Sequence, residues 1–83
     1  MKLYRTQAFD SQFKNLPPDV QNRVDKQLSR LVENPRHPSL RLHKMQGRDQ
    51  WEISVTMNYR ITLSIVGEEY ILRGVGKHDI LKK

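Results

Sequence analysis

The chain has 83 residues, of which 36% are hydrophobic, and it contains no cysteine. A chain of this length has room for one hydrophobic core, and its lack of cysteine excludes disulfides, thiolate nucleophiles and cysteine-bound zinc. Fifteen Lys and Arg against nine Asp and Glu give a net charge of +6, which favours polyanionic partners such as RNA, DNA, the ribosome or an acidic protein. No apolar run approaches the roughly 20 residues of a membrane span, and no signal-peptide core follows the N-terminus. We therefore expect residues 1–83 to form one soluble, cytoplasmic domain that does not associate with membranes.

The first part of the chain predicts a short strand followed by two helices. Residues 2–6 alternate polar and apolar side chains, as an opening strand does, and Thr6 can cap the helix that follows. The first helix stops before Pro17, and the second runs from Pro18 to Asn34. The apolar stripes at helical spacing are Phe9, Phe13 and Leu16 in the first helix, and Val20, Val24, Leu28, Leu31 and Val32 in the second.

From residue 40 onward the hydrophobic period changes toward two, which predicts four further strands. Their apolar positions are Leu40, Leu42 and Met45; Trp51, Ile53 and Val55; Tyr59, Ile61, Leu63 and Ile65; and the segment from Tyr70 to Val75. Because Trp51 shares its phase with Ile53, a place in the core is favoured over a role in stacking on bases. The order β-α-α-β-β-β-β predicts an α+β fold, with two N-terminal helices packed on a mainly antiparallel sheet whose other face stays polar.

Several short motifs carry a family resemblance. They are Leu42-His43-Lys44-Met45-Gln46-Gly47, Trp51-Glu52-Ile53, Asn58-Tyr59-Arg60-Ile61 and Val75-Gly76-Lys77-His78-Asp79. Together with the order of elements, they resemble the RelE/ParE-type toxins of type II toxin-antitoxin systems over almost the whole chain. In that superfamily, RelE-like and YafQ-like members cut mRNA on the ribosome without a metal ion, whereas ParE-like relatives inhibit DNA gyrase.

The resemblance implies a ribosome-dependent mRNA endonuclease, or mRNA interferase, that inhibits translation and needs neither a cofactor nor a metal ion. The implied partners are a cognate acidic antitoxin, mRNA and the ribosome. Two alternatives stay open on the sequence. One is a non-catalytic ParE-like toxin that inhibits DNA gyrase, and the other is a degenerate member that only binds its antitoxin.

Metal-free cleavage of RNA needs a base for the 2′-hydroxyl, an acid for the leaving oxygen and cations for the phosphate. His78 resembles the histidine of a YafQ-like Gly-variable-His pattern and is the candidate acid; the alternative is a surface histidine near the chain end. Arg60 resembles the RelE arginine and is the candidate phosphate ligand; the alternative is an ion pair with Glu52 on the neighbouring strand. The base is either His43, which resembles a YafQ position, or Glu52. For His43 an exposed strand histidine is the alternative.

Other charged residues extend this expected site and also show where the chain departs from its relatives. We expect a set of cations to surround the same face and to bind RNA: Lys44, Arg48, Arg73 and Lys77. Glu52 and Ser54 stand at strand positions where RelE itself carries lysines. The three histidines lack the close spacing of a zinc-binding helix motif, so no metal site is expected.

Overall fold

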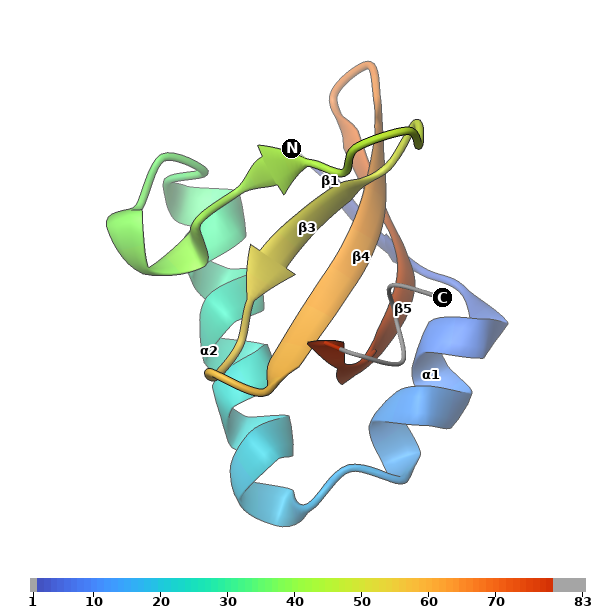
Figure 1. The fold of residues 1–83 in the computed structure, drawn as a ribbon, viewed down its shortest axis with the longest axis vertical. Helices are drawn as coiled ribbons and strands as arrows, with labels where there is room; N and C mark the ends of the chain where they lie inside the picture. Colours follow the sequence, from blue (N-terminus) through green and yellow to red (C-terminus); the bar gives the residue numbers. More distant parts are fainter. Residues whose placement is uncertain (1, 79–83) are drawn as a thin grey trace.

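In the computed structural model, which describes residues 2–78, the first part of the chain folds into the expected strand and two helices (Figure 1). These elements are β1 (Lys2–Arg5), α1 (Gln7–Lys14) and α2 (Pro18–Glu33). The hydroxyl of Thr6 caps α1 by accepting a hydrogen bond from the backbone N–H of Phe9. α2 begins at Pro18, whose fixed φ and missing N–H suit a first helical position. Neither helix in the described range is long and apolar enough to cross a membrane.

The rest of the chain completes a five-stranded sheet. Its strands are β2 (His43–Lys44), β3 (Trp51–Ser54), β4 (Tyr59–Val66) and β5 (Glu69–Lys77). The spatial order is β1-β5-β4-β3-β2, in which β2 to β5 pair antiparallel and β1 joins β5 in parallel. The predicted order of elements and the mainly antiparallel sheet are therefore confirmed.

The strand expected to begin at Leu40 is much shorter than predicted. Leu40 is fully buried, but it lies in a 3₁₀ turn (Pro38–Leu40) rather than in a strand. The next residue, Arg41, adopts a left-handed conformation with φ of 50°, which turns the chain before it can pair with β3. Only His43 and Lys44 then join the sheet. The prediction of a strand from Leu40 is wrong, because a short alternation of apolar and polar residues does not distinguish a turn from a strand.

The hydrophobic core lies between the sheet and the two helices, which occupy one side of it (Figure 1). Its fully buried side chains are Phe9, Val24, Leu31, Leu40, Ile53, Ile61, Leu63 and Leu72. Trp51 is partly buried and packs against this core, in line with the favoured prediction. Val32, assigned to the apolar stripe of α2, is instead 42% exposed. The helix therefore packs through the other four apolar residues of the stripe.

A bulge in β5 changes which residues face the core. Arg73 is an extra residue between two consecutive pairs of the β4–β5 ladder. Before the bulge Leu72 is buried in the core, and after it Val75 is, so the alternation shifts by one residue. His78 lies three residues beyond Val75. The shift therefore turns His78 toward the polar face of the sheet rather than toward the helices.

Candidate active site

Strand register brings three of the expected site residues onto the polar face. His43 of β2 lies directly opposite Glu52 of β3, and Glu52 lies directly opposite Thr62 of β4. Side chains of directly opposed residues in an antiparallel pair point to the same face. Arg60 precedes Thr62 by two residues and therefore shares that face. With His78 at the end of β5, four strands contribute to one surface.

The carboxylate of Glu52 is the centre of this surface. Its Oε1 atom lies 3.5 Å from Nε2 of His43, 3.9 Å from Nε of Arg60 and 3.9 Å from Nδ1 of His78. The Glu52 side chain is only 3% exposed. A buried carboxylate is costly unless basic groups compensate it; Arg60 does so as a permanent cation, and each histidine does so when it is protonated. We call His43, Glu52, Arg60 and His78 the Glu52 cluster.

The guanidinium of Arg60 holds the β3–β4 turn as well as Glu52. Its Nη1 atom donates to the carbonyl oxygens of Thr56, of Met57 at 3.1 Å and of Tyr59 at 3.0 Å. The ion pair with Glu52, weighed from the sequence as an alternative to phosphate contact, is thus present. Among residues 2–78 the Nη2 atom has no hydrogen-bond partner. The guanidinium therefore keeps one nitrogen with which it can meet a phosphate while the rest of it is held in place.

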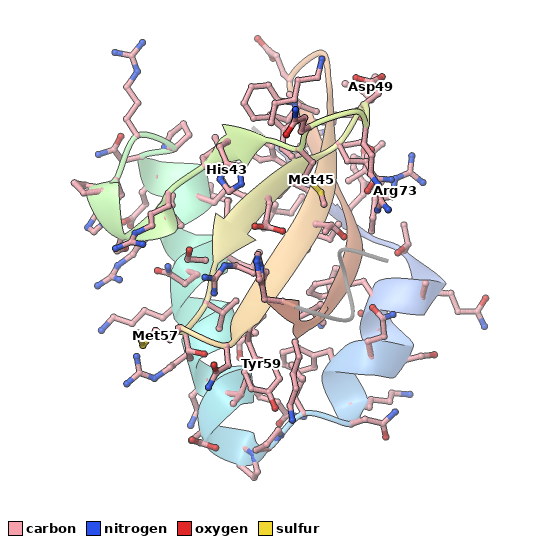
Figure 2. All side chains as sticks on the ribbon, viewed as in Figure 1. His43, Met45, Asp49, Met57, Tyr59 and Arg73 are labelled. Carbon is pink, nitrogen blue, oxygen red and sulfur yellow. The ribbon has the colours of Figure 1, made fainter. Side chains whose placement is uncertain are left out.

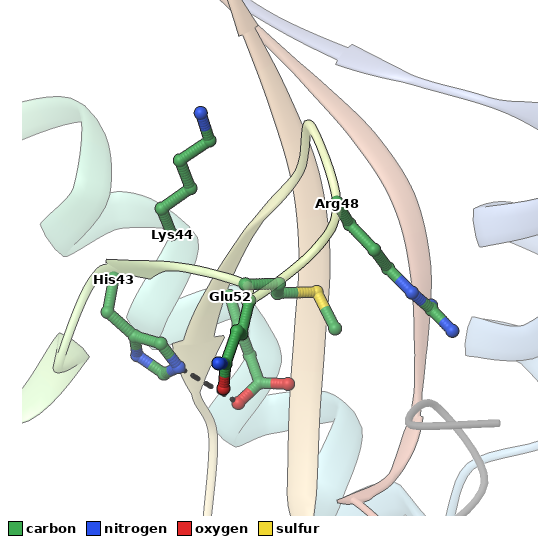
Figure 3. A pocket seen from close by; sticks show the side chains of 6 residues that line it. His43, Lys44, Arg48 and Glu52 are labelled. Carbon is green, nitrogen blue, oxygen red and sulfur yellow. Dashed lines mark ion pairs between the residues drawn. The ribbon is translucent and has the colours of Figure 1, made fainter.

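His43 is the accessible histidine of the cluster. Its side chain is 56% exposed, and Nδ1 lies 2.8 Å from the carbonyl oxygen of Arg41. A carbonyl oxygen can only accept a hydrogen bond, so Nδ1 carries the hydrogen and donates it. Nε2, beside Glu52, is then the ring nitrogen that can exchange a proton with a substrate. Figure 3 shows this ring directed at the Glu52 carboxylate.

His78 is held more tightly. Its backbone N–H donates to the carbonyl oxygen of Asn58 at 2.8 Å, which ties the end of β5 to the β3–β4 turn. Its Nδ1 atom is buried and has no hydrogen-bond partner, although the whole side chain is 31% exposed. The exposed part of the ring therefore lies away from Nδ1. Glu52 is the charge that compensates this buried nitrogen.

Two cavities flank the Glu52 cluster. One, of about 470 Å³, is lined by His43, Lys44, Met45, Gln46, Arg48 and Glu52 (Figure 3). The other, of about 530 Å³, is lined by Met57, Asn58, Tyr59, Lys77 and His78. From the sequence, Tyr59 was placed in a strand and in a motif, but neither Tyr59 nor Met57 was assigned to the site, and the signal available for both was their position near Arg60. The cluster is thus reached from two sides.

The four expected RNA-binding cations are not gathered at one place around the Glu52 cluster. Lys44 points away from Glu52 in Figure 3, and its ammonium lies 4.0 Å from Asp49. Arg73 donates from Nε to the hydroxyl of Ser64 at 3.0 Å and lies across the sheet from His43 (Figure 2). Arg48 and Lys77 line the two cavities beside the cluster. Among residues 2–78 no group of three His, Asp or Glu side chains is arranged to hold a metal ion.

No protein-family model and no curated protein sequence matches the chain. Solved structures do match it. YafQ from E. coli strain BL21(DE3) superposes with a TM-score of 0.82 at 13% identity, covering 98% of this chain and 97% of that one. The YoeB/ParE toxin from Agrobacterium tumefaciens gives 0.78 at 13% identity, covering 94% and 99%. A chain of the RelB-RelE antitoxin-toxin complex from Methanococcus jannaschii gives 0.73 at 21%, covering 95% and 94%. The chain therefore has the fold of the RelE/ParE toxins along nearly its whole length.

Proposed function

We propose that this chain is the toxin of a type II toxin-antitoxin pair and that it cleaves mRNA on the ribosome. The observation that carries the proposal is the convergence of two histidines and an arginine on the buried carboxylate of Glu52. Groups of this kind supply the base, the acid and the cation that cleavage of a phosphodiester by its own 2′-hydroxyl requires. The RelE/ParE fold supports the same assignment, since solved structures with this fold include toxins.

In the proposed reaction His43 takes the proton of the 2′-hydroxyl through Nε2, and the hydroxyl oxygen attacks the adjacent phosphorus. The bond from phosphorus to the 5′-oxygen breaks, and His78 gives that oxygen its proton. The products are a 2′,3′-cyclic phosphate and a free 5′-hydroxyl. Arg60 stabilises the charge that develops on the phosphate oxygens. Each histidine ends the step in the protonation state in which the other began it.

Exposure favours His43 over Glu52 as the base. Both were candidates from the sequence, but a base must come within hydrogen-bond reach of the proton it removes. The side chain of His43 is 56% exposed, whereas that of Glu52 is 3% exposed and lies behind the two histidines and Arg60. We therefore assign Glu52 the task of orienting the two imidazoles.

The test of this proposal is the variant His78→Ala, assayed on ribosome-bound message with the cleavage positions mapped. Loss of an acid-base side chain lowers a rate by about 10²- to 10⁴-fold, and we expect a loss of that size. The matched control is His37→Ala, because His37 lies in the loop before the 3₁₀ turn and outside the Glu52 cluster. Thermal unfolding of both variants checks that the fold is kept. Undiminished cleavage by His78→Ala would contradict the assignment of His78 as the acid, and an unchanged protein that does not cleave the message would favour a toxin that acts by binding, such as an inhibitor of gyrase.

The proposed partner is an acidic antitoxin that covers the Glu52 cluster. The net charge of +6 favours an acidic segment, and structures similar to this chain include the DinJ-YafQ toxin-antitoxin complex of E. coli. Such a segment would compete with RNA for Arg60 and His78. Protection of these residues by a purified partner is the supporting result.

A further inference from the structure

A second group of cations lies on α2, away from the Glu52 cluster. Arg23, Lys26 and Arg30 follow one another at spacings of three and four residues, so they share one face of the helix over about 10 Å. They line a groove of about 150 Å³ whose other walls are Gln27, Ser39 and Val55. The proposed reaction uses none of these residues.

Hydrogen bonds hold the floor of this groove in place. The buried side chain of Gln27 donates from its amide nitrogen to the carbonyl oxygens of Ser39 at 3.2 Å and Ser54 at 2.7 Å. Its amide oxygen accepts from Nη1 of Arg30 at 3.1 Å, and the same Nη1 donates to the hydroxyl of Ser39 at 3.1 Å. Arg30 is thus positioned by neutral groups, which fix its guanidinium without neutralising its charge.

Among residues 2–78, no ion pair compensates the charge of the groove. In the described part of the chain, neither Arg23 nor Lys26 nor Arg30 forms an ion pair with a carboxylate, and the same holds for nearby Arg41. None of the described residues that line the groove is an Asp or a Glu. Clustered cations without counter-charges raise the local potential and attract an anionic ligand.

The groove continues toward the Glu52 cluster. A second groove, of about 300 Å³, is lined by Ser39, Arg41, Ser54, Val55, Thr56, Met57 and Arg60. It shares Ser39 and Val55 with the groove on α2, and Arg60 belongs to the Glu52 cluster. Met57 also lines the cavity beside His78. We call Arg23, Lys26, Arg30, Arg41 and Arg60 the α2 track, because they follow this path from the helix round the end of β3.

We propose that the α2 track binds the phosphodiester backbone of single-stranded RNA, either the message whose scissile bond lies at the Glu52 cluster or an adjoining ribosomal strand. This inference rests on the proposed function for its choice of RNA. Guanidinium groups pair with phosphates through two parallel hydrogen bonds, and four of the five cations are arginines.

An acidic protein segment fits the same path less well. A disordered segment that folds on a surface anchors itself through apolar side chains as well as charges. Of the two apolar side chains among the described residues that line the two grooves, Val55 is buried and Met57 is exposed. A polar path lined with arginines is typical of backbone recognition in single strands.

The test uses the double variant Arg23→Gln/Lys26→Gln, in which both changed side chains are exposed and Arg30 keeps its hydrogen bonds. The matched control is Lys2→Gln/Lys14→Gln, which removes the same charge from exposed positions on β1 and α1. The probe is a 2′-O-methylated RNA dodecamer, which lacks the attacking hydroxyl, and its affinity is measured over a range of salt concentrations. A single-stranded site loses about 0.7 units of slope in log K against log salt for each lost phosphate contact. We expect a slope smaller by about 1.4 units and roughly ten-fold weaker binding, with both unchanged in the control.

The outcomes separate this inference from the proposed function. Because the probe is not cleaved, a reduced slope supports the α2 track even if no cleavage is found. An unchanged slope overturns the track even if His78→Ala abolishes cleavage. Measuring the affinity of the double variant for ribosomes with and without bound message distinguishes the two sources of RNA, since a loss that does not depend on message assigns the track to a ribosomal strand. A larger loss for an acidic peptide than for the RNA dodecamer overturns the proposal and assigns the track to a protein.

Discussion

The helix-covered face of the sheet and its polar face both contain buried side chains, but those on the first are apolar and those on the second are polar or charged. Along β4, Ile61 and Leu63 are fully buried against the helices, while Thr62 between them is buried on the other side. Next to Thr62, Glu52 is buried as well. Burial of apolar surface stabilises the fold directly, whereas burial of a carboxylate is tolerated only with compensating partners. The first face should therefore determine stability, and the second should determine activity.

The largest effect on stability is expected on the helix-covered face. Leu31→Ala removes a fully buried side chain of α2 and leaves a cavity, which should lower the free energy of unfolding by about 2 to 5 kcal/mol. A domain of this size has a total stability on the order of 5 to 15 kcal/mol, so the loss is a large fraction. Urea denaturation measures it. Val32→Ala is the control, because the side chain of Val32, next to Leu31 in the sequence, is 42% exposed. This substitution should change the free energy of unfolding by about 0.5 kcal/mol or less. Equal losses of stability in the two variants would contradict the view that the helix-covered face determines stability.

On the polar face, Glu52→Gln should change activity more than stability. The substitution keeps the shape but removes the negative charge among the two histidines and Arg60, and we expect a stability loss of about 1 to 3 kcal/mol. Without the carboxylate the two imidazoles lose the group that orients them, so the rate of cleavage of ribosome-bound message should fall by about 10²-fold. The control is Glu68→Gln, which removes the same charge from an exposed turn. An undiminished rate of cleavage would contradict the orienting role of Glu52.

The smallest effect concerns Tyr70, which is buried on the helix-covered face. Burial raises the pKa of its phenol above the usual value of 10.0. Its neutral form is therefore favoured in the folded state, and the stability this contributes is present below about pH 10 and is lost as the pH rises through the folded-state pKa. Between about pH 9 and pH 11, Tyr70→Phe should lose less stability than the unchanged protein in urea denaturation. Tyr4→Phe, at an exposed position, should follow the unchanged protein.

Much of the fold follows from local patterns in the sequence. The period of α2 and the proline at its start predict the helix, and alternation predicts β3 and β4 because each effect acts within a few residues. The strand β2 was predicted, but its short length was not, because that depends on the left-handed conformation of Arg41. The sequence did place Arg60 beside Glu52, since both are outward positions on neighbouring strands.

The burial of Glu52 could not be predicted from its own strand. Glu52 alternates with apolar residues and has the pattern of a solvent-exposed position. It is buried because His43, Arg60 and His78 approach it from other elements, and their approach depends on register and on the bulge in β5. One signal was available. The apolar phase changes between Leu72 and Val75, which indicates an extra residue in the strand.

Because of that extra residue, the number of residues in β5 matters for the site independently of which residues they are. Without the bulge, His78 would lie an even number of residues after Leu72 and would face the helices as Leu72 does. Because Arg73 is an extra residue, the facing is reversed beyond it, and His78 faces Glu52 instead. A relative that lacked one residue at this point could keep every histidine, arginine and glutamate and still direct its last histidine toward the helices. Among natural variants of this fold, insertions and deletions near the bulge should therefore separate active from inactive proteins better than the identities of the side chains do.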